Sequence, residues 1–309
     1  MKRRLLATLV FGLLIGISAH GQQTYKFATR DTLDLYLDVY NPAPEADRYY
    51  EGHLKPTVLF VFGGGFVSGT RDGEFQVEWF RKLTEAGYGV VAIDYRLGMK
   101  GYKVGKGLSG ANKAAGQFYL SQQMGVEDVC AAVNFLSTNK VGVEVDNLVL
   151  AGSSAGAIIA VATEHDIVNG TVPELPEGFN FKGVMSFAGA VISTSGKPEF
   201  KARPCPIVFF HGTEDRAVAY HHYAIAGRGL WGSSFFDEQF DKKGYPHLIY
   251  RYEGRTHDVA AYMHVLWEEE MNFLEQDVML GRARTIDATV LDSTLPSWSN
   301  ISMDDIYRR

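Results

Sequence analysis

The feature that most constrains the fold of this chain is the alternation of short apolar runs with longer segments of helical periodicity. Residues 57–62 (TVLFVF) are continuously apolar, which is typical of a strand buried on both faces of a sheet. The pattern predicts a mostly parallel sheet with helices on both faces, in which ligands bind outside the carboxyl ends of the strands. Further strands are predicted at 32–40, 89–95, 147–151, 183–187, 207–210 and 248–252, and helices at 74–86, 123–138, 155–165 and 259–276.

The sequence Gly-Ser-Ser-Ala-Gly at 152–156 lies between a predicted buried strand and a predicted Ala-rich helix. The pattern G-x-S-x-G in a strand–turn–helix context is that of a nucleophile elbow, where a sharp turn exposes a serine hydroxyl. Ser154 is therefore the candidate nucleophile, whereas Ser153 is out of register. The alternative interpretation is an unreactive Gly-rich turn.

Three consecutive glycines, residues 63–65, follow the apolar run at 57–62. Glycines leave backbone N–H groups accessible, and the oxyanion of a tetrahedral acyl intermediate needs two or three such donors. The backbone N–H of Ala155, at the start of a helix, would supply a further donor with the help of the helix dipole. A phosphate-binding loop would instead require G-x-G-x-x-G or a terminal Gly-Lys-Ser, and neither is present.

A serine nucleophile needs a base, and the base needs an orienting acid. Among nine histidines, His257 lies between the last predicted strand and the last predicted helix. For the acid, Asp215 in His-Gly-Thr-Glu-Asp (211–215) is the first choice and Glu214 the alternative, because Asp258 is too close to His257 in sequence. His221 and His222 lack a third ligand at helical spacing, so no metal is expected.

These motifs resemble those of α/β-hydrolase esterases of the hormone-sensitive-lipase and carboxylesterase type. The resemblance covers roughly residues 57–260 and also includes the sequence Asp-Tyr-Arg-Leu at 94–97. It implies an α/β-hydrolase fold and ester hydrolysis without a cofactor. Two departures are Phe62, where the usual residue before the glycines is His, and the absence of a long N-terminal helical cap. The implied site consists of Ser154 as nucleophile, His257 as base, Asp215 as its orienting acid, and Gly64, Gly65 and Ala155 as oxyanion donors.

Two segments, 98–122 and 220–246, fit neither the strand nor the helix pattern and are predicted to be loops over the active site; the alternative is that they are ordinary surface loops. Aromatic residues in and near these segments, among them Phe66, Tyr220 and Trp231, are candidate substrate-binding residues, and the alternative is that they belong to the core. Small size and predicted export resemble secreted bacterial carbohydrate esterases, which implies a short-acyl or carbohydrate-linked ester as substrate. The alternatives are a secreted serine exopeptidase on the same fold and a non-catalytic hydrolase-fold binding protein.

The first 21 residues have the pattern of a signal peptide. A basic start at 2–4 precedes an apolar stretch at 5–17 and small residues at a cleavage site, which predicts a secreted or periplasmic protein; the alternative is an uncleaved membrane anchor. No later apolar stretch is long enough to predict membrane insertion, and a net charge of -6 disfavours nucleic acid as a partner. Residues 22–280 are predicted to form the hydrolase domain and 281–309 a loosely structured tail. Cys130 and Cys205 are expected to be buried and unpaired.

Overall fold

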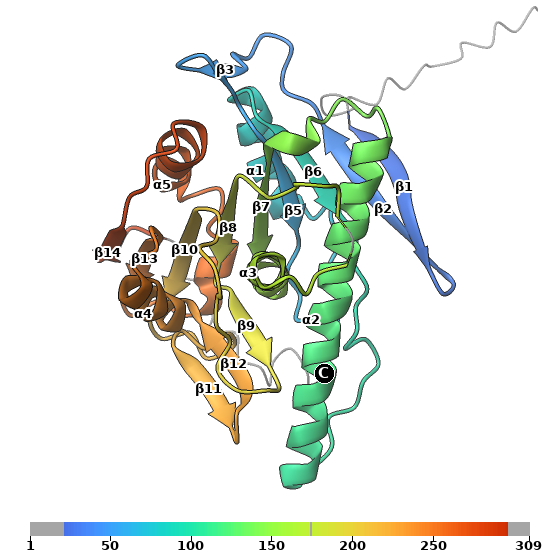
Figure 1. The fold of residues 1–309 in the computed structure, drawn as a ribbon, viewed down its shortest axis with the longest axis vertical. Coiled ribbons are helices and arrows are strands. Elements are labelled where there is room, and N and C mark those ends of the chain that lie inside the picture. The colour runs from blue at the N-terminus through green and yellow to red at the C-terminus, as the bar shows by residue number, and fades with distance from the viewer. Residues whose placement is uncertain (1–21, 174, 296–309) are drawn as a thin grey trace, which may run out of the picture.

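The computed structural model describes residues 22–173 and 175–295, so the predicted signal peptide at 1–21 lies outside the described residues. A nine-stranded sheet forms the centre, in the order β1-β2-β6-β5-β7-β8-β10-β13-β14 (Figure 1). Strand β2 is antiparallel to both of its neighbours, and all other neighbours in this sheet are parallel. The strands are β1 (Gln23–Arg30), β2 (Leu33–Tyr40), β5 (Thr57–Val61), β6 (Gly89–Ile93), β7 (Leu148–Ser153), β8 (Gly183–Phe187), β10 (Ile207–Gly212), β13 (Leu248–Tyr252) and β14 (Ile286–Val290).

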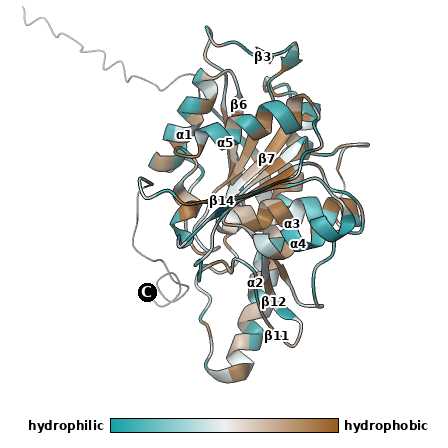
Figure 2. Ribbon diagram, turned by 90° about the vertical axis from the view of Figure 1, so that its left-hand side faces the viewer, coloured by the Kyte–Doolittle hydropathy of each residue, from teal (hydrophilic) through white to brown (hydrophobic). Residues whose placement is uncertain are grey.

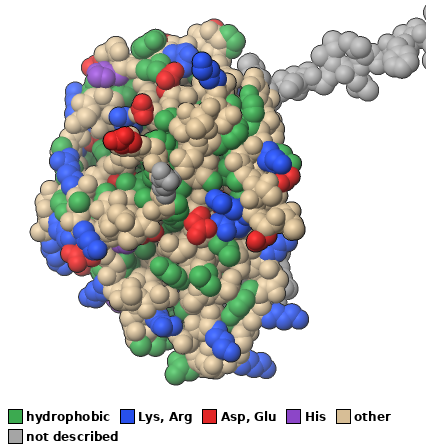
Figure 3. Space-filling view, turned by 45° about the vertical axis from the view of Figure 1, so that its right-hand side comes forward, with side chains coloured by type: hydrophobic (Ala, Val, Ile, Leu, Met, Phe, Trp, Pro, Cys, Tyr) green, Lys and Arg blue, Asp and Glu red, His purple; other side chains and the backbone are tan. Residues whose placement is uncertain are grey.

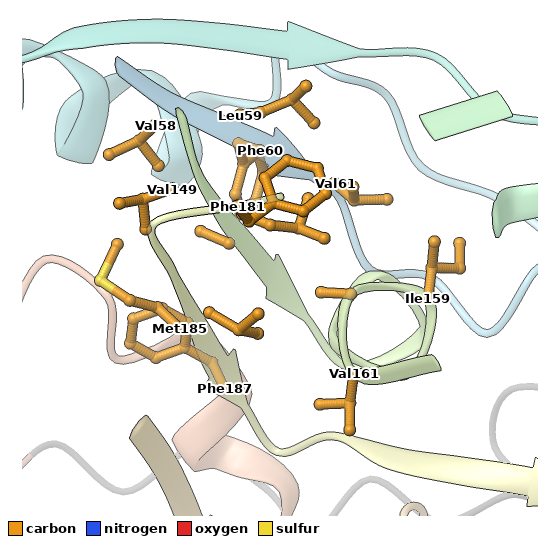
Figure 4. Packing of buried hydrophobic residues seen from close by; sticks show 14 of the residues in the cluster. Val58, Leu59, Phe60, Val61, Val149, Ile159, Val161, Phe181, Met185 and Phe187 are labelled. Carbon is orange, nitrogen blue, oxygen red and sulfur yellow. The ribbon is translucent and has the colours of Figure 1, made fainter. Parts of the chain in front are cut away.

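The central strands are buried on both faces, as their continuous apolar sequences predict. Every residue of β6, β7 and β8 is buried, and so is β5 apart from Thr57. Figure 4 shows part of this core, whose buried side chains include Val58 to Val61 of β5, Met185 of β8 and Ile159 of a flanking helix. Each fully buried Val or Leu side chain contributes about 1.5–3 kcal/mol to stability. Burial of these side chains therefore stabilises the sheet, and the sheet determines the positions of the loops that follow its strands.

Helices cover both faces of the sheet, and Figure 2 shows the apolar strands lying between them. Helices α1 (Glu74–Glu85) and α5 (Trp267–Asn272) lie on one face, where the indole Nε1 of Trp79 donates to Glu270 Oε2 at 2.7 Å. Helices α2 (Gly107–Thr138), α3 (Ala155–Asn169) and α4 (Ser233–Lys243) lie on the other face. The predicted helix-covered parallel sheet is confirmed.

Helix α2 begins sixteen residues earlier than predicted, so the prediction of a loop at 98–122 is wrong for most of that segment. Two features hold this first half of the helix: Ala114 is buried, and the side-chain amide of Gln122 bonds both backbone groups of Ile192, at 2.7 and 3.1 Å. Figure 1 shows the first half of α2 extending well past the ends of the strands. The segment does overhang that edge of the sheet, but as a helix.

The segment 220–246 is also not a loop. It contains β11 (His222–Ile225), β12 (Arg228–Gly232) and α4, and the two strands form a hairpin that pairs with β9 (Ala190–Ser193) in a small antiparallel sheet. Ala226 and Gly227, with φ of 50° and 76°, make the turn of the hairpin. This hairpin lies at the same end of the molecule as the first half of α2 (Figure 1).

The C-terminal region differs from the prediction in two ways. Residues 286–290 form strand β14 in the main sheet, parallel to β13, and are not part of a loose tail. The predicted helix at 259–276 is divided into a 3₁₀ turn at His257–Ala261, α5, and a wide π-type turn at Phe273–Met279. Short strands β3 (Tyr49–Tyr50) and β4 (His53–Leu54), and a 3₁₀ turn at Val145–Asn147, complete the described elements.

Cys130 and Cys205 are buried and unpaired, as predicted. Over residues 22–173 and 175–295, no helix is both long enough and apolar enough to cross a membrane.

Candidate active site

The turn between β7 and α3 holds Ser154 in a strained backbone conformation, with φ of 52° and ψ of -117°. Such a conformation persists only where the surroundings enforce it. Close packing does so here: a Cβ on Gly156 would lie 2.0 Å from the carbonyl oxygen of Val61, and one on Gly152 would lie 2.2 Å from that of Gly156. The glycines at both ends of the motif are therefore required by backbone contacts, and the turn has the geometry of a nucleophile elbow.

Three distant side chains meet at the carboxyl ends of the parallel strands. Ser154 Oγ lies 2.8 Å from His257 Nε2, and His257 Nδ1 lies 2.7 Å from Asp215 Oδ2. Because the carboxylate can only accept, His257 Nδ1 donates to it, which leaves Nε2 to accept from the serine hydroxyl. This tautomer suits a general base that removes the hydroxyl proton. The structure thus brings together the three residues predicted to form the triad.

Asp215 is held by contacts on both of its carboxylate oxygens. The backbone N–H groups of Ala217 and Val218 donate to Oδ1, each at 2.9 Å, and the ring of His211 lies 3.3 Å from Oδ2. Burial alone would raise the pKa of this carboxyl, but hydrogen bonds from His211 and His257 outweigh burial and hold the pKa well below its usual range. Asp215 therefore stays ionised and able to orient the imidazole.

The neighbouring acidic residues do not face His257. Glu214 is exposed, and Asp258 accepts from the backbone of Thr256 and the hydroxyl of Tyr262. Ser153, the serine out of register, donates instead to the carbonyl oxygen of Ala260 at 2.7 Å.

His211 was not among the sequence-predicted site residues. It is fully buried, and its ring contacts Asp215, the carbonyl oxygen of Val218 and the hydroxyl of Ser233. One indication of this role is present in the sequence: His211 lies four residues before Asp215, in the same segment at the end of a predicted strand. The sequence does not show that the strand continues through His211 and turns its ring back toward the carboxylate.

The glycine loop packs directly against the elbow. A Cβ on Gly63 would lie 3.0 Å from the carbonyl oxygen of Ser153 and 3.2 Å from Ser154 Cβ, and one on Gly64 would lie 2.0 Å from the carbonyl oxygen of Ser68. Gly65 and Ala155 both line the cavity next to Ser154, whereas Gly64 is not part of that lining. The glycine loop and the start of α3 therefore both border the cavity into which Ser154 opens.

A cavity of about 1010 Å³ opens beside Ser154 and His257, and two of its walls come from the segments that were predicted to be loops. The first half of α2 forms one wall and the β11–β12 hairpin another. Of the three candidate substrate-binding residues, Phe66 lines the cavity. Tyr220 and Trp231 do not line it: Tyr220 packs edge-on against His211, and Trp231 is buried beside Phe235. Their sequence neighbours Ala219 and Leu230 line it instead.

The Asp-Tyr-Arg-Leu sequence at 94–97 forms ion pairs that connect the elements around the site, but it does not contact Ser154. Asp94 and Asp38 both bind the guanidinium of Arg71, which follows the glycine loop, at 2.9 and 2.7 Å. Arg96 binds the buried carboxylate of Asp128 in α2 at 3.0 Å. The motif therefore ties the loop, strand β2 and helix α2 together.

His221 and His222 lie on the surface, with His221 Nε2 3.2 Å from Glu238 Oε1. In the part of the chain that the structure describes, no group of three His, Cys, Asp or Glu side chains is arranged to hold a metal ion.

Residues 21–166 match the model of the carboxylesterase family. The chain is 29% identical over 167 residues to a chlorogenic acid esterase of Aspergillus niger, and 40% identical over 76 residues to a non-reducing polyketide synthase of Emericella nidulans. These matches cover 53% and 25% of the chain, and 27% and 3% of the relatives. The chain thus matches well under half the length of these curated relatives.

The fold is similar to that of a thermophilic esterase from the planctomycete Thermogutta terrifontis. Its propionate-bound structure matches with a TM-score of 0.57 and 22% identity, covering 84% of this chain and 96% of the esterase. Its butyrate-bound structure matches with a TM-score of 0.55, 22% identity and coverage of 85% and 96%. The predicted α/β-hydrolase fold is therefore confirmed, and the chain resembles esterases of that type in both sequence and fold.

Proposed function

We propose that the protein is a serine hydrolase that cleaves carboxylic esters through an acyl-enzyme on Ser154. The observation that carries this proposal is the continuous hydrogen-bonded chain from Ser154 Oγ through His257 to Asp215, at 2.8 and 2.7 Å. The match of residues 21–166 to the carboxylesterase family supports an ester as the substrate.

In the acylation step, His257 Nε2 accepts the hydroxyl proton as Ser154 Oγ attacks the ester carbonyl. Asp215 stabilises the imidazolium that forms, since its carboxylate stays ionised. Backbone N–H groups of Ala155 and of the loop at Gly64 and Gly65 would donate to the oxyanion, each contributing about 3 kcal/mol to lowering the barrier. His257 then returns the proton to the leaving alcohol, and water repeats the sequence on the acyl-enzyme.

The cavity favours an ester with a bulky apolar group over a simple acetyl ester. Its volume of about 1010 Å³ is at the upper end of the range for small-molecule sites. Its walls include Phe118, Ile158, Ile192 and Leu230, none of which carries a polar group. The similarity to a chlorogenic acid esterase makes aromatic esters, chlorogenic acid among them, the first substrates to test.

The test compares Ser154→Ala with its neighbour Ser153→Ala on p-nitrophenyl esters of increasing acyl length and on chlorogenic acid. Ser154→Ala should lower kcat by roughly 10⁴-fold or more and abolish labelling by a fluorophosphonate probe. Ser153→Ala should keep the labelling, because its hydroxyl bonds only to the carbonyl oxygen of Ala260. Full activity in Ser154→Ala would refute the serine mechanism. Faster turnover of aminoacyl nitroanilides than of any ester would favour a peptidase.

A further inference from the structure

The wall of the active-site cavity has a charge opposite to that of the protein as a whole. The chain carries a formal net charge of -6, yet the residues that line the cavity include two arginines, Arg216 and Arg228, and no Asp or Glu. The only charged side chains of the wall are thus cationic, and they lie in the same cavity as Ser154.

The two arginines lie on different elements. Arg216 directly follows the triad residue Asp215, and Arg228 begins strand β12 of the hairpin. Arg228 Nη1 donates to Asn112 Oδ1 of α2 at 3.0 Å, so its guanidinium lies between the two walls of the cavity. Within the described residues, neither guanidinium takes part in an ion pair. In the described part of the chain, no carboxylate therefore binds either guanidinium directly.

The segments around the cavity extend this charge bias. Residues 96–126, which include the first half of α2, contain Lys106, Lys113 and three further basic residues but no acidic one. Residues 216–236, which include the hairpin, also contain no acidic residue. Figure 3 shows the result on the face it presents: the lower end of the molecule carries Lys, Arg and hydrophobic side chains, and the Asp and Glu side chains lie higher up.

The rim of the cavity is also apolar. Leu108, Tyr223 and Ile225 line the cavity and remain 73%, 69% and 52% exposed. Exposed apolar side chains around a cavity indicate a surface that is covered when the ligand binds. The cavity therefore combines a large apolar surface with two arginines that form no ion pair among the described residues.

We propose that the natural substrate is an ester that carries a free carboxylate beside a bulky apolar group, with Arg216 and Arg228 as the carboxylate-binding residues. This inference rests on the proposed ester hydrolysis and deepens it. A guanidinium binds a carboxylate through paired N–H donors, and such charge-assisted bonds are stronger than neutral ones. The positive potential of the cavity would also raise the rate at which an anionic ester arrives.

The experiment uses two matched pairs of esters. In the first pair, 4-(butanoyloxy)benzoate and 4-(butanoyloxy)benzamide, the carboxylate is on the alcohol side. In the second pair, the 4-nitrophenyl monoester of octanedioic acid and 4-nitrophenyl octanoate, it is on the acyl side. The quantity measured is the ratio of kcat/KM for the anionic ester to kcat/KM for its neutral partner, in the wild-type protein and in Arg216→Gln, Arg228→Gln and the double variant.

In at least one pair, we expect each single substitution to lower this ratio about tenfold, mainly through KM of the anionic ester. About 1 M salt should reduce the wild-type ratio, because the charges are exposed to solvent. Arg203→Gln is the matched control: it removes the same charge from an exposed position that lines a second cavity, shortly before β10, and should leave both ratios unchanged.

An unchanged ratio for both pairs in every arginine variant would overturn the inference while leaving ester hydrolysis intact. If these variants also sediment less with phosphatidylglycerol vesicles, an anionic lipid surface is the ligand of this cationic face. If the wild-type protein hydrolyses neither these four esters nor the p-nitrophenyl series and chlorogenic acid, the proposed function fails and the substrate inference fails with it.

Discussion

The Nδ1 atom of His257 lies 2.7 Å from Oδ2 of Asp215, and both side chains are buried. The carboxylate fixes which ring nitrogen carries the proton, so the other nitrogen faces Ser154 Oγ as an acceptor. The same carboxylate also accepts from the backbone and lies beside His211. Its position is therefore set by four contacts, and the geometry of the base depends on it.

Replacing Asp215 by Asn should lower kcat on p-nitrophenyl butyrate by roughly 10⁴-fold, because the amide favours the wrong tautomer of His257. Thermal unfolding should show that the variant is still folded. Glu214→Gln is the control, since that side chain is exposed and does not face His257. An equal decrease in kcat in the two variants would mean that Asp215 does not orient His257.

Two glycines of helix α2 should respond in opposite directions to substitution by alanine. A Cβ on Gly116 would meet nothing within 4 Å, whereas one on Gly125 would lie 2.3 Å from Ile159 Cδ1 of α3. Gly116→Ala should therefore stabilise the protein by about 0.5–1 kcal/mol through the better helix propensity of alanine. Gly125→Ala should destabilise it by about 1–3 kcal/mol through overpacking.

Urea denaturation of both variants measures the two changes in the free energy of unfolding. If Gly125→Ala proves as stable as Gly116→Ala, α2 and α3 do not pack as closely at Gly125 as described.

The parallel part of the sheet could be predicted from the sequence because most residues of its buried strands are apolar and follow one another without a helical period. The triad could be predicted because the ends of these strands meet at one edge of the sheet, which brings the loops containing Ser154, Asp215 and His257 together. In these regions local pattern and tertiary environment agree, so the sequence alone carries the information.

The cavity walls could not be predicted, because their local sequence conflicts with the structure they adopt. Gly107, Gly110 and Gly116 weaken the helix propensity of the first half of α2, and its contacts with Ile192 through Gln122 are invisible in the sequence. The hairpin turn uses Ala226-Gly227 in place of the usual Asn-Gly. Strand β14 alternates strictly between apolar and polar residues, but over only five residues, and none of them is fully buried; its place in the sheet is set by its pairing with β13.

Replacing Arg96 by Met should destabilise the protein by about 3–5 kcal/mol, because it leaves the buried carboxylate of Asp128 without its main partner. Arg96 donates to this carboxylate from both its backbone and its guanidinium, at 2.8 and 3.0 Å, while Arg30 is farther away at 3.5 Å. The double variant with Asp128→Leu should recover part of the loss, since no charge then remains buried. Denaturation of the single and double variants tests this, and additive losses would contradict it.

Replacing Glu164 by Gln should change how stability depends on pH. Glu164 lies in α3 and is fully buried, with Oε1 accepting from the backbone N–H of Cys205 at 2.7 Å. Burial raises the pKa of this carboxyl from 4.5 to about 7 in spite of that hydrogen bond. Between these two values the unfolded chain has lost the proton and the folded protein has kept it, so stability falls as the pH rises through this window.

The glutamine variant has no such proton. Its free energy of unfolding relative to wild type should therefore rise by about 3 kcal/mol from pH 4.5 to pH 8, as measured by urea denaturation at several pH values. Glu199→Gln serves as the control: Glu199 is exposed, and its hydrogen bond with Lys243 lowers its pKa, so any change should be small and of opposite sign. A difference between the Glu164 variant and wild type that stays constant with pH would show that this carboxyl is ionised in the folded protein.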